Sequence, residues 1–236
     1  MRHVRHGVPA ALLAVAVAAG ASGCSFSVRV SHSSPAPAQS AGPLAGLTAD
    51  QIVTKANADL FAASSLRMRG TRTGAGSGTF DLELAPGRGC TGTIEVTGSG
   101  DFQIVVIGRK LWLRPNAAYW KQQHSSPAVL RLVSGKYLSG TTADSGLGVL
   151  SSLCVLSHTG RPAAGGSGTS LTFDGQPAIA FGAPGDQGIV SDSATPEVLQ
   201  MSVSSSSTLD FSDYNVPVRL TAPPADETID GAAYGM

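Results

Sequence analysis

Between residues 66 and 107, apolar and polar side chains alternate along the chain, and short glycine-bearing turns interrupt the alternation. Side chains of a β-strand point alternately to the two faces of a sheet, so a period of two indicates strands with one buried and one solvated face. Strands of this kind joined by short turns favour an antiparallel meander. The four segments that carry the pattern are SLRMRGT, GTFDLEL, CTGTIEV and DFQIVVI.

A helix is predicted in front of this meander, in LTADQIVTKANADLFAAS. Thr48 and Gln51 have the spacing of a capping box, in which each side chain accepts a bond from the other residue's backbone N–H. Ile52, Ala56 and Leu60 then recur at helical spacing. They predict one apolar stripe along an amphipathic helix.

Helical and strand patterns both return beyond the meander. Residues 125–133 and 144–156 are predicted as helices, the second mostly buried because apolar residues occupy much of its surface. Strands resume after a glycine-rich break at 164–168, beginning with a hairpin that turns at Asp174-Gly175. Together these elements predict a fold of the α+β class.

The chain begins with the pattern of an export signal. Arg2 and Arg5 precede a short apolar stretch that ends in three small residues directly before Cys24. This pattern resembles the lipobox of bacterial lipoproteins, in which the cysteine is acylated and becomes the new N-terminus. We therefore expect Cys24 to anchor the protein by lipid to the outer leaflet of the cell membrane. The alternative is secretion with cleavage after Ala21, which would leave Cys24 as an unpaired thiol.

Composition divides the rest of the chain and limits its partners. We expect a signal peptide at 1–23, the lipidated cysteine with a flexible tether at 24–46, and one folded domain at 47–236, because the stretch before residue 47 is rich in Ser, Ala and Pro. The chain has 29 glycines, 16 basic and 16 acidic residues, and a formal net charge of zero. That balance predicts a strand-rich exported protein with no nucleic-acid partner.

Three segments of the domain resemble a known family. They are LTADQIVTKANADLFAASSLRMRGT, LWLRPNAAYW, and FDGQPAIAF followed by LDFSDYNVPVRLTAPPADETID. Together they are similar to the actinobacterial cell-envelope lipoproteins of the LppX/LprG type, whose fold is related to that of the LolA lipoprotein carriers. The resemblance covers about residues 47–230. It implies a strongly curved antiparallel half-barrel sheet with helices covering the concave face, and in some members an apolar cavity that takes up acyl chains.

The resemblance and the alternation together lead to an expected function. We expect a monomer without a cofactor that binds a hydrophobic ligand, the acyl chain of an envelope lipid or lipoglycan, in a half-barrel cavity for carriage or storage. The alternative is a structural or interaction lipoprotein with the same fold and a filled core, which binds a partner protein and no ligand. The cavity is predicted to be lined by Leu66, Met68, Phe80, Leu82, Leu84, Ile94, Phe102, Ile104, Leu147 and Leu150.

Two cysteines of the predicted domain lie on the apolar faces of their elements. Cys90 lies on a predicted strand and Cys154 on the predicted helix at 144–156. Thiols oxidise readily outside the cytoplasm, so a disulfide that clamps this helix onto the sheet is expected. Two separate buried thiols are the alternative, because the distance between their Cα atoms cannot be read from sequence.

No motif in the sequence indicates catalysis, and we expect no enzyme and no metal site. GRGCTG at 87–92 matches G-x-G-x-x-G, but it joins two predicted strands and opens no helix, so it indicates a turn. His32, His124 and His158 have no partner at zinc-motif spacing. Asp210 and Asp213 could form a carboxylate pair, although a solvated turn is the interpretation we favour.

Two further groups of residues admit a functional and a structural interpretation. Arg67 and Arg69 share one wet strand face with Arg72 just beyond them, and the three could contact anionic head groups or only solvent. Three aromatic residues could gate the mouth of a pocket, or they could only pack against a hairpin. These residues are Trp112, Tyr119 and Trp120.

The anchor can be tested directly. If Cys24 is acylated, Cys24→Ala should move the protein from the membrane fraction to the medium. No apolar stretch of the sequence is long enough to span a bilayer, so the lipid would be the main attachment. Fractionation followed by immunoblotting measures this. Unchanged partitioning of the variant would show that the anchor lies elsewhere.

Overall fold

Twelve strands form one sheet in the part of the chain that the computed structural model describes, which is residues 42–74, 77–123, 125–156, 168–183, 185–202 and 206–234. Neighbouring strands follow the order β12-β6-β5-β4-β3-β2-β1-β11-β10-β9-β8-β7. All pairs are antiparallel except β12 with β6, which is parallel. The strands are β1 Leu66–Arg72, β2 Gly78–Ala85, β3 Gly89–Val96, β4 Gly100–Ile107, β5 Lys110–Pro115, β6 Tyr137–Thr141, β7 Thr169–Phe173, β8 Gln176–Ala183, β9 Asp186–Ser191, β10 Val198–Ser202, β11 Ser207–Ser212 and β12 Thr228–Asp230.

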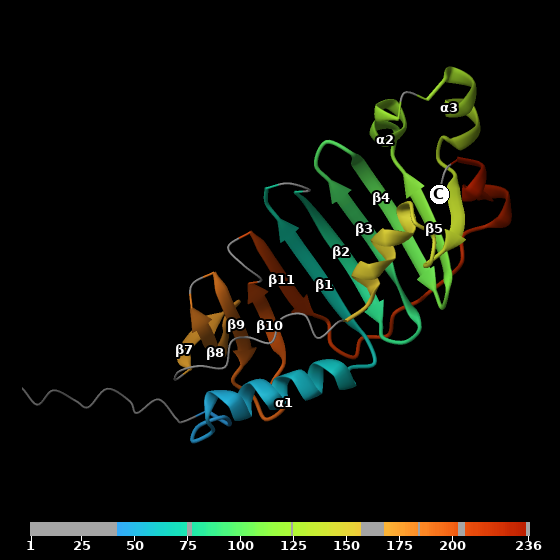
Figure 1. Cartoon of the computed structure of the whole chain (residues 1–236). Coiled ribbons are helices and arrows are strands. Elements are labelled where there is room, and N and C mark those ends of the chain that lie inside the picture. The colour runs from blue at the N-terminus through green and yellow to red at the C-terminus, as the bar shows by residue number, and fades with distance from the viewer. Residues whose placement is uncertain are drawn as a thin grey trace, which may run out of the picture. The chain divides into compact units, whose positions relative to one another are not determined.

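The sheet is curved and does not close, and helical segments lie on its concave face (Figure 1). This confirms the predicted α+β half-barrel. The α-helices are α1 Ala49–Ala62, α2 Ala117–Gln122 and α3 Pro127–Val133, and the 3₁₀ helices are η1 Leu147–Cys154, η2 Ala225–Glu227 and η3 Gly231–Tyr234. In Figure 1, α1 runs along the ends of β10 and β11, and η1 lies in front of the middle strands.

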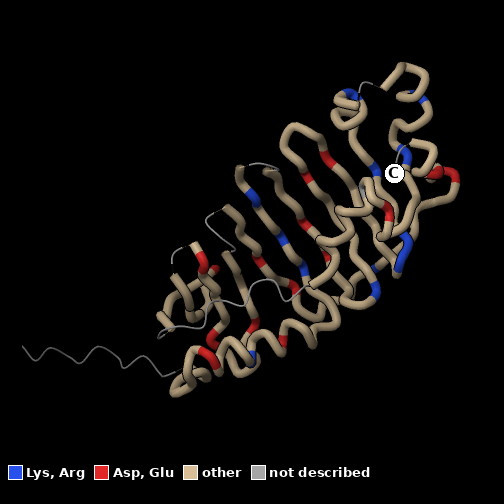
Figure 2. The backbone as a smooth tube through the Cα atoms, viewed as in Figure 1, with Lys and Arg blue, Asp and Glu red and all other residues tan. Residues whose placement is uncertain are grey.

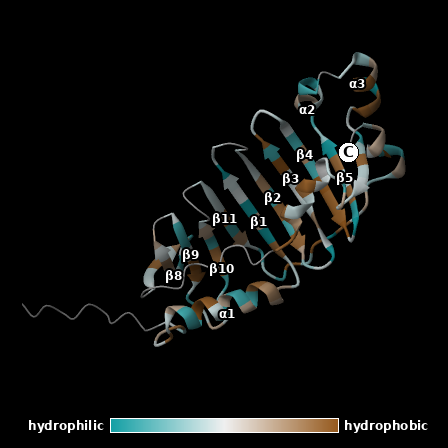
Figure 3. Ribbon diagram, viewed as in Figure 1, coloured by the Kyte–Doolittle hydropathy of each residue, from teal (hydrophilic) through white to brown (hydrophobic). Residues whose placement is uncertain are grey.

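Strand register places the predicted apolar positions on one face of the sheet, called here the inner face. Leu66 lies opposite Leu84, and Met68 lies between Leu82 on β2 and Phe211 on β11. The intervening residues, among them Arg67 and Asp81, point to the opposite, outer face. Figure 3 shows the resulting bands of apolar residues along the strands and on α1 and η1. The alternation of apolar and polar residues in the sequence is therefore sufficient to assign the buried face of the meander.

Helix α1 begins as the capping box predicts. The Gln51 N–H donates to Thr48 Oγ1 at 3.3 Å, and the Thr48 N–H donates to Gln51 Oε1 at 2.8 Å. The predicted stripe of Ile52, Ala56 and Leu60 is buried in the main core. Two otherwise unsatisfied N–H groups at the start of the helix thus have partners, and the apolar face packs on the sheet.

Two helical segments differ from the prediction. Residues 147–154 form a 3₁₀ helix and not an α-helix; Gly146 at its start makes no side-chain cap, and Gly148 lowers helix propensity. Helix α2 was not predicted, and it carries Tyr119 and Trp120, which were expected in a hairpin. The Asn116 side chain caps it by accepting from the Tyr119 N–H at 3.0 Å.

The hairpin at Asp174-Gly175 is confirmed. Both residues have positive φ, 47° and 81°, as a two-residue turn between twisted strands requires. At the other boundary of the domain, Leu44 was expected in the tether. It is buried in the main core, and its N–H donates to Asp192 Oδ1 at 3.1 Å. The folded part therefore includes residues before position 47.

The predicted signal peptide, Cys24 and most of the tether lie outside the described residues. Within the described ranges, none of the helices has both the length and the hydrophobicity that crossing a bilayer requires.

Candidate functional site

An apolar cavity of about 390 Å³ lies between the C-terminal half of η1 and the sheet. We call it the inner cavity. Strands β1, β2, β10 and β11 form its floor, and η1 with the residues after it forms its cover. Its walls are Leu60, Met68, Thr71, Arg72, Phe80, Ser152, Leu153, Val155, Leu156, Met201, Ser207, Leu209 and Phe211.

Glycine at position 70 determines the shape of the cavity floor. Gly70 lies on the inner face between Phe80 on β2 and Leu209 on β11. A Cβ on Gly70 would collide with the ring of Phe80, which therefore lies across β1 in the space that the missing side chain leaves. The ring and Leu209 both border the cavity.

The predicted lining residues fall into three groups. Met68 and Phe80 line the inner cavity. Leu150 packs half-buried against the main core, and Leu147 belongs to η1 although its side chain is outside what the structure describes. The remaining residues are buried in the packed core beside the cavity, each no more than 3% exposed: Leu66, Leu82, Leu84, Ile94, Phe102 and Ile104.

The cavity therefore lies nearer to β1 and β11 than the sequence predicted. Its residues on β10 and β11 were missed, although Leu209 and Phe211 alternate in the segment TLDFS. Alternation could have placed them on a buried face. What it could not supply is the pairing of β1 with β11, which are far apart in sequence and adjacent in the sheet.

A second hollow of about 600 Å³ lies at the sheet edge where the β2–β3 and β4–β5 turns meet η1. We call it the edge cavity. Ser152, Val155 and Leu156 line both cavities, so the two meet at the C-terminal end of η1. Its other walls are Phe61, Pro86, Gly87, Arg88, Gly89, Val106, Gly108, Thr142, Gly148, Val149, Ser151 and Cys154.

The disulfide between Cys90 and Cys154 is confirmed, with the two Cα atoms 5.4 Å apart. It joins the last residue of η1 to β3 beside the edge cavity. A 3₁₀ helix has poorer hydrogen-bond geometry than an α-helix. The covalent link therefore fixes the segment that covers both cavities.

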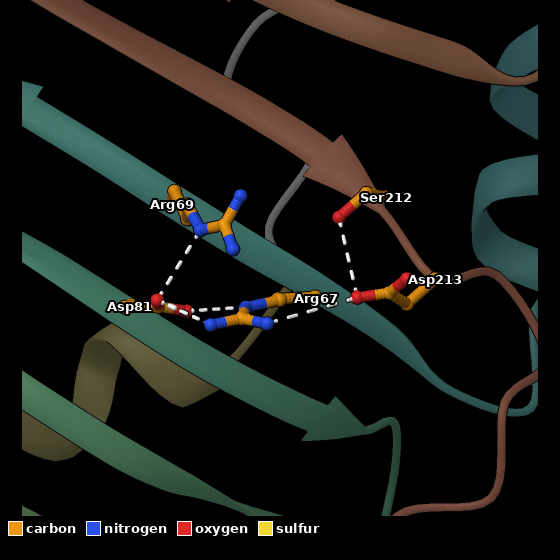
Figure 4. A network of polar contacts seen from close by, with 5 residues as sticks. All are labelled: Arg67, Arg69, Asp81, Ser212 and Asp213. Carbon is orange, nitrogen blue, oxygen red and sulfur yellow. Dashed lines mark hydrogen bonds and ion pairs between the residues drawn. The ribbon is translucent and has the colours of Figure 1, made fainter.

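Of the three arginines that could have met anionic head groups, Arg67 and Arg69 are paired with carboxylates on the outer face (Figure 4), whereas Arg72 lines the inner cavity. Arg67 donates from Nε and Nη2 to the two oxygens of Asp81, each at 2.6 Å, and Arg69 Nε donates to the same carboxylate at 3.2 Å. Asp213 lies 4.0 Å from Arg67. The hydrogen bonds from Arg67, followed by those from Arg69, hold the pKa of Asp81 below its usual range. These pairs support the structural interpretation of the outer face.

Asp210 and Asp213 do not act as a pair. Asp210 accepts from Gln200 Nε2 at 2.8 Å, whereas Asp213 lies in a turn after β11 with a φ of 53°. Among the described residues, no cluster of His, Cys, Asp and Glu could hold a metal ion. His32, His124 and His158 lie outside those residues. The segment 87–92 forms the β2–β3 turn and the start of β3, as predicted.

The three aromatic residues line neither cavity. Trp120 is buried on Val133 and Leu138 beneath α3. Tyr119 makes edge-to-face contacts with Phe102 and Trp120, both with ring centroids 5.1 Å apart. Trp112 lies on β5 at a position that faces outward. Packing, and not gating, is the role that these contacts support.

The chain is thus an open half-barrel protein with an apolar inner face and a half-open apolar cavity under η1. It matches no protein-family model and no curated protein. Among solved structures, LprF from Mycobacterium bovis is similar at 12% identity with a TM-score of 0.46, over 75% of this chain and 97% of LprF. A LolA superfamily protein from Nitrosomonas europaea is similar at 11% identity with a TM-score of 0.21, over 76% and 96%.

Removing the disulfide should destabilise the fold. In the chain-entropy model, a loop closed over 64 residues contributes about 4 kcal/mol. The Cys90→Ala/Cys154→Ala variant should therefore lose about 4 kcal/mol of unfolding free energy in urea titrations followed by circular dichroism. Cys24→Ala is the matched control and should leave the midpoint unchanged. Equal midpoints for all three proteins would contradict a stabilising role for the bridge.

The Arg67–Asp81 pair makes stability depend on pH. Asp81 has a lowered pKa in the folded state, so its contribution is present above the unfolded value of about 3.9 and is lost as pH falls through the folded value. Asp81→Asn should cost about 0.5–1 kcal/mol at neutral pH, because solvent screens a carboxylate that is 35% exposed.

The difference in stability between the parent and Asp81→Asn should become smaller in acid. As pH falls through the folded-state pKa of Asp81, which lies below its usual range, urea midpoints of the parent and Asp81→Asn should converge. Asp186→Asn, at an exposed position on β9, is the control and should match the parent throughout. A constant difference down to acidic pH would refute the electrostatic explanation.

Proposed function

We propose that this protein is an exported lipoprotein, held at the outer leaflet of the cell membrane through acylated Cys24, that binds an acyl chain of an envelope lipid in the inner cavity. The observation that carries the proposal is the apolar space of about 390 Å³ under η1. This volume is within the range of about 300–1,000 Å³ typical of ligand sites. A filled core would have no such space.

The walls of the inner cavity suit a hydrocarbon chain. Leu, Met, Phe and Val side chains dominate them, and burying each CH₂ group of a ligand would contribute about 0.8 kcal/mol. Arg72 is the one charged residue among the described walls, and it is exposed at the end of β1. An acyl chain in the cavity would place an anionic head group beside this cation. The affinity for a lipid would then depend more on the length of its acyl chain than on features of its head group beyond the negative charge.

Binding without covalent chemistry is part of the proposal. The described walls contain no His, Asp, Glu or free thiol, which are the usual general bases and nucleophiles. Carriage or storage of a lipid requires only that a chain enter and leave. An opening between η1 and the sheet would let a chain do so.

Filling the cavity tests the proposal. Leu209→Trp should weaken binding of a dansyl-labelled fatty acid at least about tenfold, because the indole would occupy space that the chain needs. Its unfolding free energy should change little. Fluorescence titration of delipidated protein measures the affinity, and urea unfolding measures the stability.

Leu82→Trp provides the matched control. Leu82 is fully buried in the packed core on the same sheet face, so the larger ring should overpack it and cost about 1–3 kcal/mol. If the parent protein binds no probe and Leu209→Trp destabilises as much as Leu82→Trp, the space is part of a packed core. That result would refute the carrier function and favour a scaffold that binds a protein partner.

A further inference from the structure

The edge cavity is bordered by backbone turns that are joined to one another. The Gly108 N–H donates to the Arg88 carbonyl at 2.8 Å, and the Thr142 N–H donates to the Arg109 carbonyl at 3.1 Å. These bonds connect the β2–β3 turn, the β4–β5 turn and the segment that leads into η1. The three turns and η1 therefore form one continuous rim at one edge of the sheet.

This rim carries cations without carboxylate partners. Arg88, Arg109 and Lys110 are all exposed, and none takes part in an ion pair within the described residues. Figure 2 shows Lys and Arg positions gathered at these adjoining turns. Asp144 also lies on this rim, where its carboxylate accepts from the N–H and hydroxyl of Thr141 and keeps its negative charge, so the three cations outnumber it. Arg67 and Arg69, in contrast, share the carboxylate of Asp81.

Large apolar side chains project beside Arg88, which lines the edge cavity together with them. Val149 and Val155 are each 65% exposed on and just after η1, and both line the edge cavity. Exposed apolar residues next to cations are the combination that binds proteins to the interface of an anionic bilayer, where apolar groups enter the head-group layer and cations contact phosphates.

We propose that the rim of the edge cavity is a membrane-docking face. Val149 and Val155 enter the head-group region of an anionic bilayer, and Arg88, Arg109 and Lys110 contact lipid phosphates. The inference rests on the proposed function in one respect, namely that the inner cavity takes up an acyl chain. Because Ser152, Val155 and Leu156 line both cavities, docking at the edge brings the inner cavity within reach of the bilayer. A chain could then leave the membrane without crossing open water.

Vesicle binding of the full chain carrying Cys24→Ala tests the docking face without the lipid anchor. Cosedimentation should show stronger binding to vesicles of equal parts phosphatidylglycerol and phosphatidylcholine than to phosphatidylcholine alone. Arg88→Gln/Arg109→Gln should weaken binding to the anionic vesicles roughly 25-fold, since each cation near such a surface contributes about fivefold. Salt at about 1 M should weaken binding of the parent similarly, because it shortens the screening length to about 3 Å.

Matched controls lie on helices outside this rim. Lys121→Gln/Arg131→Gln removes two exposed cations from α2 and α3, and it should bind as the parent does. Val149→Ser should weaken binding roughly tenfold through lost apolar burial. Leu132→Ser, at an α3 position that is 61% exposed, should not.

The outcomes separate the two proposals. Equal binding to neutral and anionic vesicles, or equal losses in the rim variants and their controls, would overturn the docking face. Binding of the dansyl-labelled fatty acid in the absence of vesicles reports on the inner cavity alone, and the Arg88→Gln/Arg109→Gln and Val149→Ser variants should keep it. Vesicle binding with no probe binding would support the docking face and refute the acyl-chain site.

Discussion

The fold depends on burying one face of a sheet that does not close. In a closed small barrel, side chains of the inner face cover one another. Here the inner face must be covered by other elements: α1 lies along the ends of β10 and β11, and η1 lies over the middle strands (Figure 1). α1 is secured by its capping box and four buried residues. η1 is short and of the 3₁₀ type, so its hold on the sheet relies on the bond between Cys154 and Cys90.

Local sequence patterns predicted an element well where the residues that determine it lie close together in sequence. Alternation placed Leu66, Met68, Leu82 and Leu84 on the buried face, the Thr48–Gln51 spacing marked the start of α1, and Asp174-Gly175 marked a hairpin. Two elements, α2 and η1, also depend on residues close in sequence, but their signals are weaker. Asn116 is a good cap, but α2 is only six residues long and shows no repeated apolar stripe. The 3₁₀ form of η1 follows from two glycines that helical periodicity alone does not weigh.

The position of the cavity could not be predicted in this way, because it arises where distant segments meet. The alternation of Leu209 and Phe211 marks them as buried but does not indicate which strand lies beside them. Their pairing with β1 creates the floor, and η1, which lies between them in sequence, provides the cover. The partners of charged residues could not be predicted from sequence for the same reason. The arginines at 67 and 69 resemble an exposed basic patch in sequence, yet the register puts Asp81 directly opposite Arg69.

The absence of a side chain at Gly70 has a consequence for how such a protein could diverge. Part of the floor of the inner cavity is an aromatic ring that rests on bare backbone, so the depth of the cavity there depends on the residue at position 80 and not on the path of β1. A smaller residue there would deepen the hollow, and a larger one at Gly70 would displace the ring into it. The volume of the inner cavity is thereby separated from the architecture of the sheet, and it can change through two facing positions.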